Sequence, residues 1–194
     1  MKAAVLIFWL LLIQTFTIMA SVKTEEQKYK VVQSQKDFEI RFYPSATLAT
    51  VYSSAKSYKE LSGNGFRTLA GYIFGGNESD TRISMTSPVH MDINNSKSSM
   101  SFVMPSLYNM ENLPKPNDSS VKLEKTDEEY VAAIRFSGYA SDADIKSYSE
   151  NLRNLLNEKG IAYYGNFRFL GYNPPYQFFG RRNEIIVSVK WESN

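Results

Sequence analysis

The chain has 194 residues, with 22 Lys and Arg against 20 Asp and Glu, and a formal net charge of +2. Cysteine is absent and His90 is the single histidine, which excludes disulfides, thiolate catalysis and an ordinary zinc site. The near-neutral charge, without a basic stripe, argues against nucleic acid as a partner.

The amino-terminal segment is typical of a secretory signal peptide. Lys2 precedes an apolar run over residues 3–13, and the small residue Ala20 stands ahead of the charged stretch "KTEEQK". The run is shorter than the roughly 20 apolar residues of a membrane-spanning helix, so an uncleaved anchor is the weaker alternative. We predict a signal peptide over residues 1–20, a flexible start over 21–28, and export to the periplasm or the extracellular space without a stable membrane anchor after cleavage.

The first half of the remaining chain, about residues 29–105, shows strand patterns on both sides of one helix. In "DFEIRFY" apolar and polar residues alternate as in a half-buried strand, and "ATLATVYSSA" is rich in β-branched residues. The stretch "YKELSGNGFRTLAGYIFGG" has helical spacing and ends at a Gly-Gly pair. Two more strands are predicted over "RISMTSPVHMDI" and "SSMSFVMP".

The second half, about residues 120–191, repeats this order after a proline-containing connector over 105–120. Two strands, "VKLEK" and "YVAAIRFSGYA", precede the clearest helix, "SDADIKSYSENLRNLLNEKG". Ser141 is placed to cap the start of that helix, and Gly160 to end it. The strands "FRFLGY" and "EIIVSVKW" follow.

This element order predicts one α+β domain over residues 29–191. Without the signal peptide the chain has 194 − 20 = 174 residues, enough for a sizeable core without disulfides. We expect a distorted, mainly antiparallel β-barrel built from two pseudo-symmetric ββαββ halves, with one helix in each half. The oligomeric state is left open.

Four stretches resemble the SOUL/heme-binding protein family. They are "LAGYIFGGN", "ISMTSPV", "FSGYA" and "GYNPPYQFFGRRNEIIV", in the order that the family has, and the resemblance extends from Tyr29 to Trp191. It implies two similar halves and reversible binding of heme or other tetrapyrroles without turnover, in some members through an apolar cleft beside the first helix. The family is also similar in fold to effector-binding domains of bacterial multidrug-responsive regulators, and it has no universal axial histidine.

His90 is a candidate axial ligand because neutral imidazole binds heme iron, and Met85 and Met91 are nearby in the sequence. The competing interpretation is an ordinary strand residue, since alternation places Val89 and Met91 on one face and His90 on the other. We favour this second interpretation. The preceding "MTSPV" is best explained as a strand interrupted by proline, where the Thr and Ser hydroxyls satisfy backbone groups.

The first helix provides the main cofactor-binding candidates. Its apolar stripe is a surface on which a flat macrocycle can lie, and two polar side chains are close enough in sequence to reach propionates or a ring edge. The alternative is that the stripe is ordinary core. The candidates are Phe66, Arg67, Leu69, Ala70, Tyr72 and Ile73.

A second group of candidates lies near the carboxyl end. Eight aromatic residues occur among the seventeen from Tyr163 to Phe179, a density that suits planar ligands and ordinary β-cores alike. The Pro-Pro pair suggests a rigid loop that presents Tyr176 as one wall of a cleft. Arg181 is a candidate partner for a carboxylate, whereas Arg182 is better explained by pairing with Glu184 or with carbonyl groups.

We therefore predict an exported protein that binds heme or another porphyrin reversibly, as a carrier, buffer or scavenger. A module for other hydrophobic ligands or for a protein partner is the alternative. A tetrapyrrole-modifying enzyme is least favoured, because no acid–base set is recognisable. Sequons at Asn77, Asn94 and Asn117 matter only in a host that glycosylates.

Overall fold

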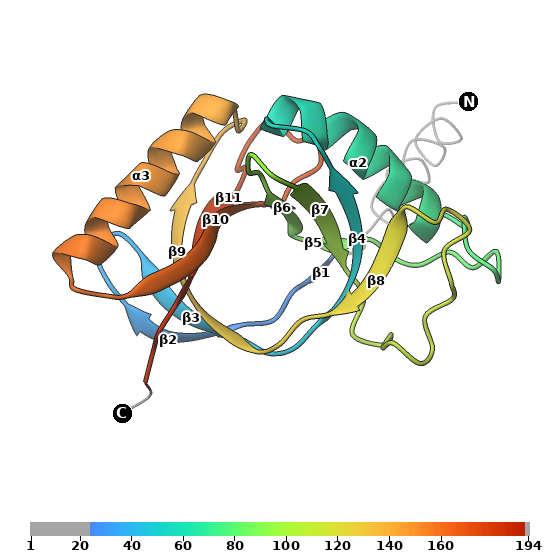
Figure 1. Cartoon of the computed structure of the whole chain (residues 1–194), viewed down its shortest axis with the longest axis horizontal. Coiled ribbons are helices and arrows are strands. Elements are labelled where there is room, and N and C mark those ends of the chain that lie inside the picture. Colours follow the sequence, from blue (N-terminus) through green and yellow to red (C-terminus); the bar gives the residue numbers. More distant parts are fainter. Residues whose placement is uncertain (1–23, 193–194) are drawn as a thin grey trace, which may run out of the picture.

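The computed structural model describes residues 24–192, so the predicted signal peptide lies outside the described residues. The described part folds into strands and two helices (Figure 1). The strands are β1 (Glu25–Glu26), β2 (Lys30–Ser34), β3 (Glu39–Tyr43), β4 (Thr47–Ser53), β5 (Thr86–Ser87), β6 (Val89–Asp92), β7 (Ser98–Val103), β8 (Val121–Lys125), β9 (Glu129–Phe136), β10 (Tyr163–Gly171) and β11 (Asn183–Val189), and the helices are α2 (Tyr58–Ile73) and α3 (Asp142–Glu158).

Nine strands form one sheet in the order β2-β3-β9-β11-β10-β6-β7-β4-β8. Apart from β2, the order is symmetric about the β10–β6 pair: β4-β7-β6 around α2 matches β9-β11-β10 around α3. The first strand of each half is exchanged, since β3 pairs with β9 and β8 pairs with β4. The predicted α+β fold of two pseudo-symmetric halves is confirmed, although the sheet is open, with β2 and β8 at its edges, and does not close into a barrel.

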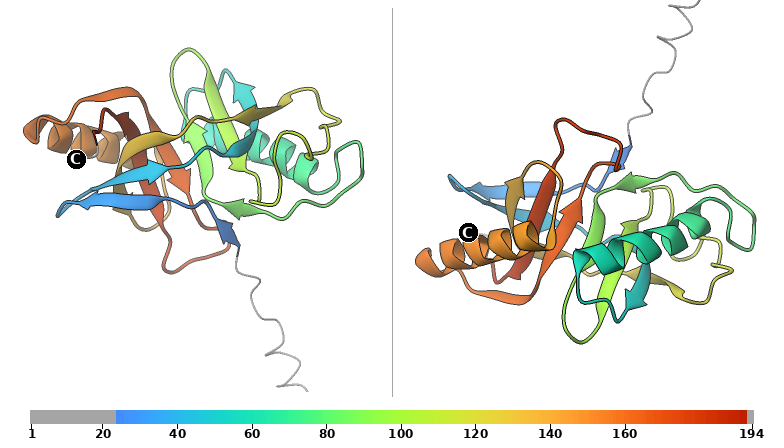
Figure 2. Two further views of the ribbon diagram at one scale, coloured as in Figure 1. Left: turned by 90° about the horizontal axis from the view of Figure 1, so that it is seen from below. Right: turned by 90° about the horizontal axis from the view of Figure 1, so that it is seen from above.

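Both helices cover the same side of the sheet (Figure 2). α2 begins after the N-cap Ser57, whose side chain accepts a hydrogen bond from the Glu60 amide. α3 begins with a capping box, in which Ser141 and Asp144 satisfy each other's backbone amides. Each helix buries leucines in the main core, such as Leu69 of α2 and Leu152 of α3, both 0% exposed. Burial of these faces fixes the two helices on the sheet.

The strand over "RISMTSPVHMDI" is interrupted at Pro88, which separates β5 from β6. The Thr86 hydroxyl donates to the Val103 carbonyl, as predicted for a hydroxyl beside such a break. β1 pairs with β5, and Gln27 is hydrogen-bonded to His90. The described part of the segment that we expected to be a flexible start, residues 24–28, is therefore built into the fold.

Asn77, the first predicted sequon, is 1% exposed. Its side-chain amide donates to the carbonyls of Tyr72 and Thr81, 3.0 and 2.8 Å away. The nitrogen that a glycan would need is thus used inside the fold.

A buried ionic network lies on the side of the sheet away from the helices. Glu184 of β11 is 0% exposed and accepts hydrogen bonds from Arg41 at 2.7 and 3.1 Å, from Arg182 at 2.9 Å and from the Tyr172 hydroxyl at 2.8 Å. Burial disfavours its charge, but the hydrogen bonds and charges of Arg41 and Arg182 outweigh burial and hold the pKa of Glu184 below its ordinary value. The network joins β3 to β11 across β9, and the predicted Arg182–Glu184 pair is part of it.

We expect Glu184→Gln to destabilise the protein at pH 7 by about 3–5 kcal/mol, because it leaves two guanidinium groups without their buried counter-charge. The folded-state pKa of Glu184 is depressed, so its contribution is complete above the ordinary glutamate pKa and is lost as the pH falls through the lower folded-state pKa. The measurement is urea unfolding of both proteins at pH 7 and at successively lower pH.

The matched control is Glu150→Gln, on an exposed position of α3. An equal, small effect of the two substitutions at pH 7 would contradict the role given to Glu184.

Candidate functional site

The pairing of β6 with β10 places Met91 opposite Phe169 under the two helices. Both side chains are buried, and both line two separate cavities. We name these the α2 cleft and the α3 cleft, after the helix beside each. Tyr58, the first residue of α2, connects the two helices, because its amide donates to Oδ1 of Asp142, the first residue of α3, at 2.5 Å. Its ring packs edge-on against Phe169, with ring centroids 5.3 Å apart.

The α2 cleft has a volume of about 570 Å³. This lies within the range of about 300–1,000 Å³ that small-molecule and cofactor sites occupy. Helix α2, strands β6 and β10, and the β10–β11 loop all contribute to it. Its lining residues are Tyr58, Ser62, Gly63, Phe66, Arg67, Ala70, Val89, Met91, Phe169, Gly171, Asn173, Pro175, Arg181 and Asn183.

The predicted residues of α2 divide between this cleft and the core. Phe66 and Ala70, both half-buried, and the exposed Arg67 line the cleft. The remaining three face the sheet instead, with exposed fractions of 2% or less; they are Leu69, Tyr72 and Ile73. The Tyr72 hydroxyl donates to the Pro114 carbonyl at 2.9 Å. For these three residues, the core interpretation is the one that the structure supports.

The β10–β11 loop separates its two candidates in the same way. Arg181 lines the α2 cleft, but its guanidinium donates to the carbonyls of Pro174 and Gln177 at 2.7 and 2.9 Å. Its Nε is buried without a partner among the described residues. Tyr176 is 76% exposed at the tip of the loop and does not line the cleft. Arg181 therefore holds the loop in shape, and the loop forms one wall.

His90 points to the other side of the sheet from the α2 cleft. It lines a smaller cavity of about 170 Å³ with Arg168 and Glu124, whereas the side chains of Val89 and Met91 pack in the main core under the helices. Its Nε2 lies 2.7 Å from Gln27 Oε1 and donates to it. Burial, with the nearby Arg168, lowers the pKa of His90 to about 3, so the ring is neutral at physiological pH. Alternation along β6 thus directs Val89 and Met91 toward the helices and His90 away from them.

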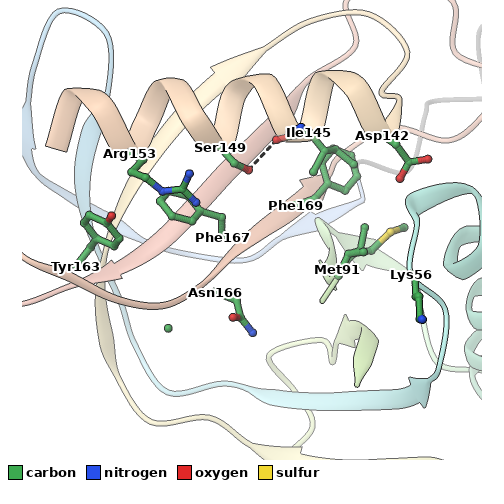
Figure 3. Close-up of a pocket in the computed structure, with 13 residues that line it drawn as sticks. Lys56, Met91, Asp142, Ile145, Ser149, Arg153, Tyr163, Asn166, Phe167 and Phe169 are labelled. Atoms are coloured by element: carbon green, nitrogen blue, oxygen red, sulfur yellow. Dashed lines mark hydrogen bonds between the residues drawn. The ribbon is translucent and has the colours of Figure 1, made fainter. Parts of the chain in front are cut away.

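The α3 cleft has a volume of about 590 Å³ (Figure 3). Phe167 and Phe169 from β10 line it together with Ile145 and Arg153 from α3. The other lining residues are Lys56, Met91, Ile93, Asp142, Lys146, Ser149, Tyr163, Gly165 and Asn166.

Sequence reasoning missed the contributions of Gly63, Met91 and Phe169 to the α2 cleft. Gly63 lies within a helix, where glycine is unfavourable, and a Cβ added there would meet no atom within 4 Å. The signal available in the sequence was a glycine in the interior of a predicted helix. For Met91 and Phe169 the strand alternation indicated the helix-covered face, but their proximity depends on the β6–β10 register.

The described residues contain no group of three or more His, Asp or Glu side chains that could hold a metal ion. None of the described helices combines the length and the apolar character needed to cross a membrane.

Two groups of known proteins are similar to this chain. Heme-binding protein 1 from Xenopus laevis is 29% identical over 181 residues, covering 87% of this chain and 93% of the relative. Heme-binding protein 2 from Mus musculus is 30% identical over 162 residues, covering 80% and 79%. In fold, the chain is similar to the C-terminal domain of EcmrR, with a TM-score of 0.59 at 8% identity, covering 84% of this chain and 98% of that domain.

A hydrolase from Listeria innocua has a TM-score of 0.58 at 11% identity, covering 82% of this chain and 94% of that structure. At this identity the likeness concerns the fold alone. The family model described as SOUL heme-binding protein matches residues 24–188. The chain therefore belongs to the SOUL heme-binding protein family.

Proposed function

We propose that this protein binds heme or a related tetrapyrrole reversibly in the α2 cleft, without chemical turnover. The observation that carries the proposal is an apolar cavity of about 570 Å³ beside α2 with an arginine at its margin. The family membership supports it, because the similar vertebrate proteins are named heme-binding proteins.

The largest apolar contributions to the cleft come from one helix and two strands. Phe66 of α2, Val89 and Met91 of β6, and Phe169 of β10 provide aromatic, branched and thioether surfaces. Such surfaces stabilise a planar macrocycle by excluding water and by dispersion contacts. Gly63 leaves room beside the helix, since no atom lies within 4 Å of where its Cβ would be.

Arg67 is the side chain that we assign to a propionate. It is exposed at the margin of the cleft, and its one hydrogen bond, to Asn64 Oδ1, is long at 3.5 Å. It has no carboxylate within 4.0 Å among the described residues. A guanidinium in this position binds a carboxylate with two parallel hydrogen bonds. Arg181 is already bound to loop carbonyls and instead supports the opposite wall.

The cleft has no histidine among its lining residues. Bound heme would bring a redox-active iron, but the residues that line the α2 cleft offer it no imidazole. The macrocycle would then be held mainly by apolar contact and one charged group. This fits a cargo that is taken up and released, and we propose that the protein acts as a carrier, buffer or scavenger outside the cytoplasm after removal of residues 1–20.

We expect hemin to produce a saturable one-to-one change of the Soret band, and Gly63→Phe to weaken this binding by roughly tenfold or more. The new ring would occupy the cleft, while the helix tolerates the change because Phe has a better helix propensity than Gly. The matched control is Gly71→Phe on the same helix, where an added Cβ also meets no atom within 4 Å and which does not line the α2 cleft. Equal hemin affinity of the two variants, or no saturable binding by the wild type, would refute the assignment.

Competition in the same titration distinguishes tetrapyrrole binding from binding of other hydrophobic ligands. Displacement of hemin by a lipid or an aromatic cation at lower concentration than by another porphyrin would favour the broader hydrophobic-ligand function. Product formed in molar excess over the protein would revive a catalytic function.

We expect His90→Ala to leave the Soret maximum of bound heme unchanged, because the imidazole lies across the sheet from the α2 cleft. The check is the absorption spectrum of the ferric and ferrous complexes of both proteins. A shifted maximum in the variant would show that iron is bound by His90 and that the ligand sits elsewhere.

A further inference from the structure

An irregularity in β10 forms one wall of the α3 cleft. The pairing of β10 with β11 shifts register between Tyr164 and Arg168, and Gly165 within the shift has φ +73°. Gly165, Asn166 and Phe167 of the shifted segment line the cavity, with α3 above them (Figure 3). Bulges of this kind redirect side chains and are frequent beside functional sites. Here the bulge turns Phe167 toward α3.

The floor and one wall of this cleft are aromatic. Tyr163 and Phe167 pack edge-to-face with centroids 5.5 Å apart, and Phe169 lines the same cavity. The Arg153 guanidinium lies 4.9 Å from the centre of the Phe167 ring, in a cation–π contact. This contact places a positive charge directly beside an apolar planar surface, with part of its conformational freedom already lost.

The rim of the cleft is positively charged. Lys56, Lys146 and Arg153 line it together with one acid, Asp142. None of the three cations has a carboxylate within 4.0 Å among residues 24–192. Asp142 instead accepts the hydrogen bond of the Tyr58 amide at the helix junction. Cations left without counter-charges around an aromatic floor are complementary to an amphipathic anion.

The two clefts therefore differ in chemistry although the two halves of the fold are alike. The α2 cleft is bordered by Arg67 and by the internally bound Arg181. The α3 cleft, of similar volume, is lined by three cationic side chains, Lys56, Lys146 and Arg153. Tyr58 and Phe169 stand at the boundary between them.

We propose that the α3 cleft is a second binding site, for a small organic anion with a flat aromatic body and a carboxylate, sulfonate or phosphate group. The aromatic body lies against Phe167 and Phe169, and the anionic group is bound by Lys56, Lys146 and Arg153. The site is distinct from the α2 cleft, although the two clefts share Met91 and Phe169 in their lining.

The probe for this site is 8-anilinonaphthalene-1-sulfonate, followed by its fluorescence, with the uncharged N-phenyl-1-naphthylamine as the matched neutral probe. We expect saturable one-to-one binding of the sulfonate that weakens with added sodium chloride, and weaker binding of the neutral probe. The double variant Lys146→Glu/Arg153→Glu should raise the Kd of the sulfonate on the order of tenfold, with little change for the neutral probe. Lys159→Glu, at the exposed end of α3, is the charge control and should leave both unchanged.

The steric test uses Ser149→Phe, which fills the cleft, with the exposed Ser147→Phe as its control on the same helix. Loss of sulfonate binding in the first variant and its retention in the second is the expected result. Unchanged sulfonate affinity in Ser149→Phe, or loss of it in Gly63→Phe instead, would overturn the proposal. Circular dichroism of each variant establishes that the fold is kept.

Hemin titration of the same variants separates this proposal from the proposed function. Ser149→Phe should bind hemin as the wild type does. If Ser149→Phe loses both ligands while Gly63→Phe keeps hemin, the anion site stands, and the tetrapyrrole belongs to the α3 cleft rather than to the α2 cleft. If hemin binding is absent from every variant and sulfonate binding behaves as expected, the anion site stands alone.

Discussion

The antiparallel pairing of β6 with β10 is the contact on which the rest of the structure depends. It joins the two halves in the middle of the sheet, while the exchange of β3 and β8 between the halves ties each to the other. It also sets Met91 opposite Phe169 beneath the helices, so that both clefts open from one shared floor. A change of register by one residue would place Met91 and Phe169 on opposite sides of the sheet and remove that floor.

The two sides of the sheet serve different purposes. The side under the helices is apolar and contains the clefts, where a ligand gains from the exclusion of water. The other side contains the charges of Arg41, Glu184 and Arg182, joined by short hydrogen bonds, and the neutral His90. Buried ion pairs contribute less to stability than their geometry suggests, but they are costly to break, and this one constrains β3 and β11. The sheet between the two sides is also what separates the imidazole from the proposed heme site.

Much of the fold could be predicted from the sequence because local patterns specify its elements. The capping residue Ser141 and the repeated strand–helix order are sufficient to predict α3 and the two halves. The exchange of the first strands could not be predicted, because each of these strands has the same alternation whichever half it joins. For the site, helical spacing identified an apolar stripe on α2 but not how it is shared: Leu69 faces the sheet, and Phe66 faces the cleft. That division follows from the rotation of the helix on the sheet, which close packing determines. Close packing is shown by Gly65, where an added Cβ would lie 3.3 Å from the Met100 sulfur.

The most direct test of the account is to locate a diamagnetic porphyrin on the protein, by titrating zinc protoporphyrin IX and following backbone amide chemical shifts. We expect the largest changes at Phe66, Ala70 and Gly171, around the α2 cleft, and small changes at Arg153 and Gly165 of the α3 cleft. The largest changes at His90 and its neighbours across the sheet, or changes spread evenly over the surface, would contradict a tetrapyrrole site beside α2.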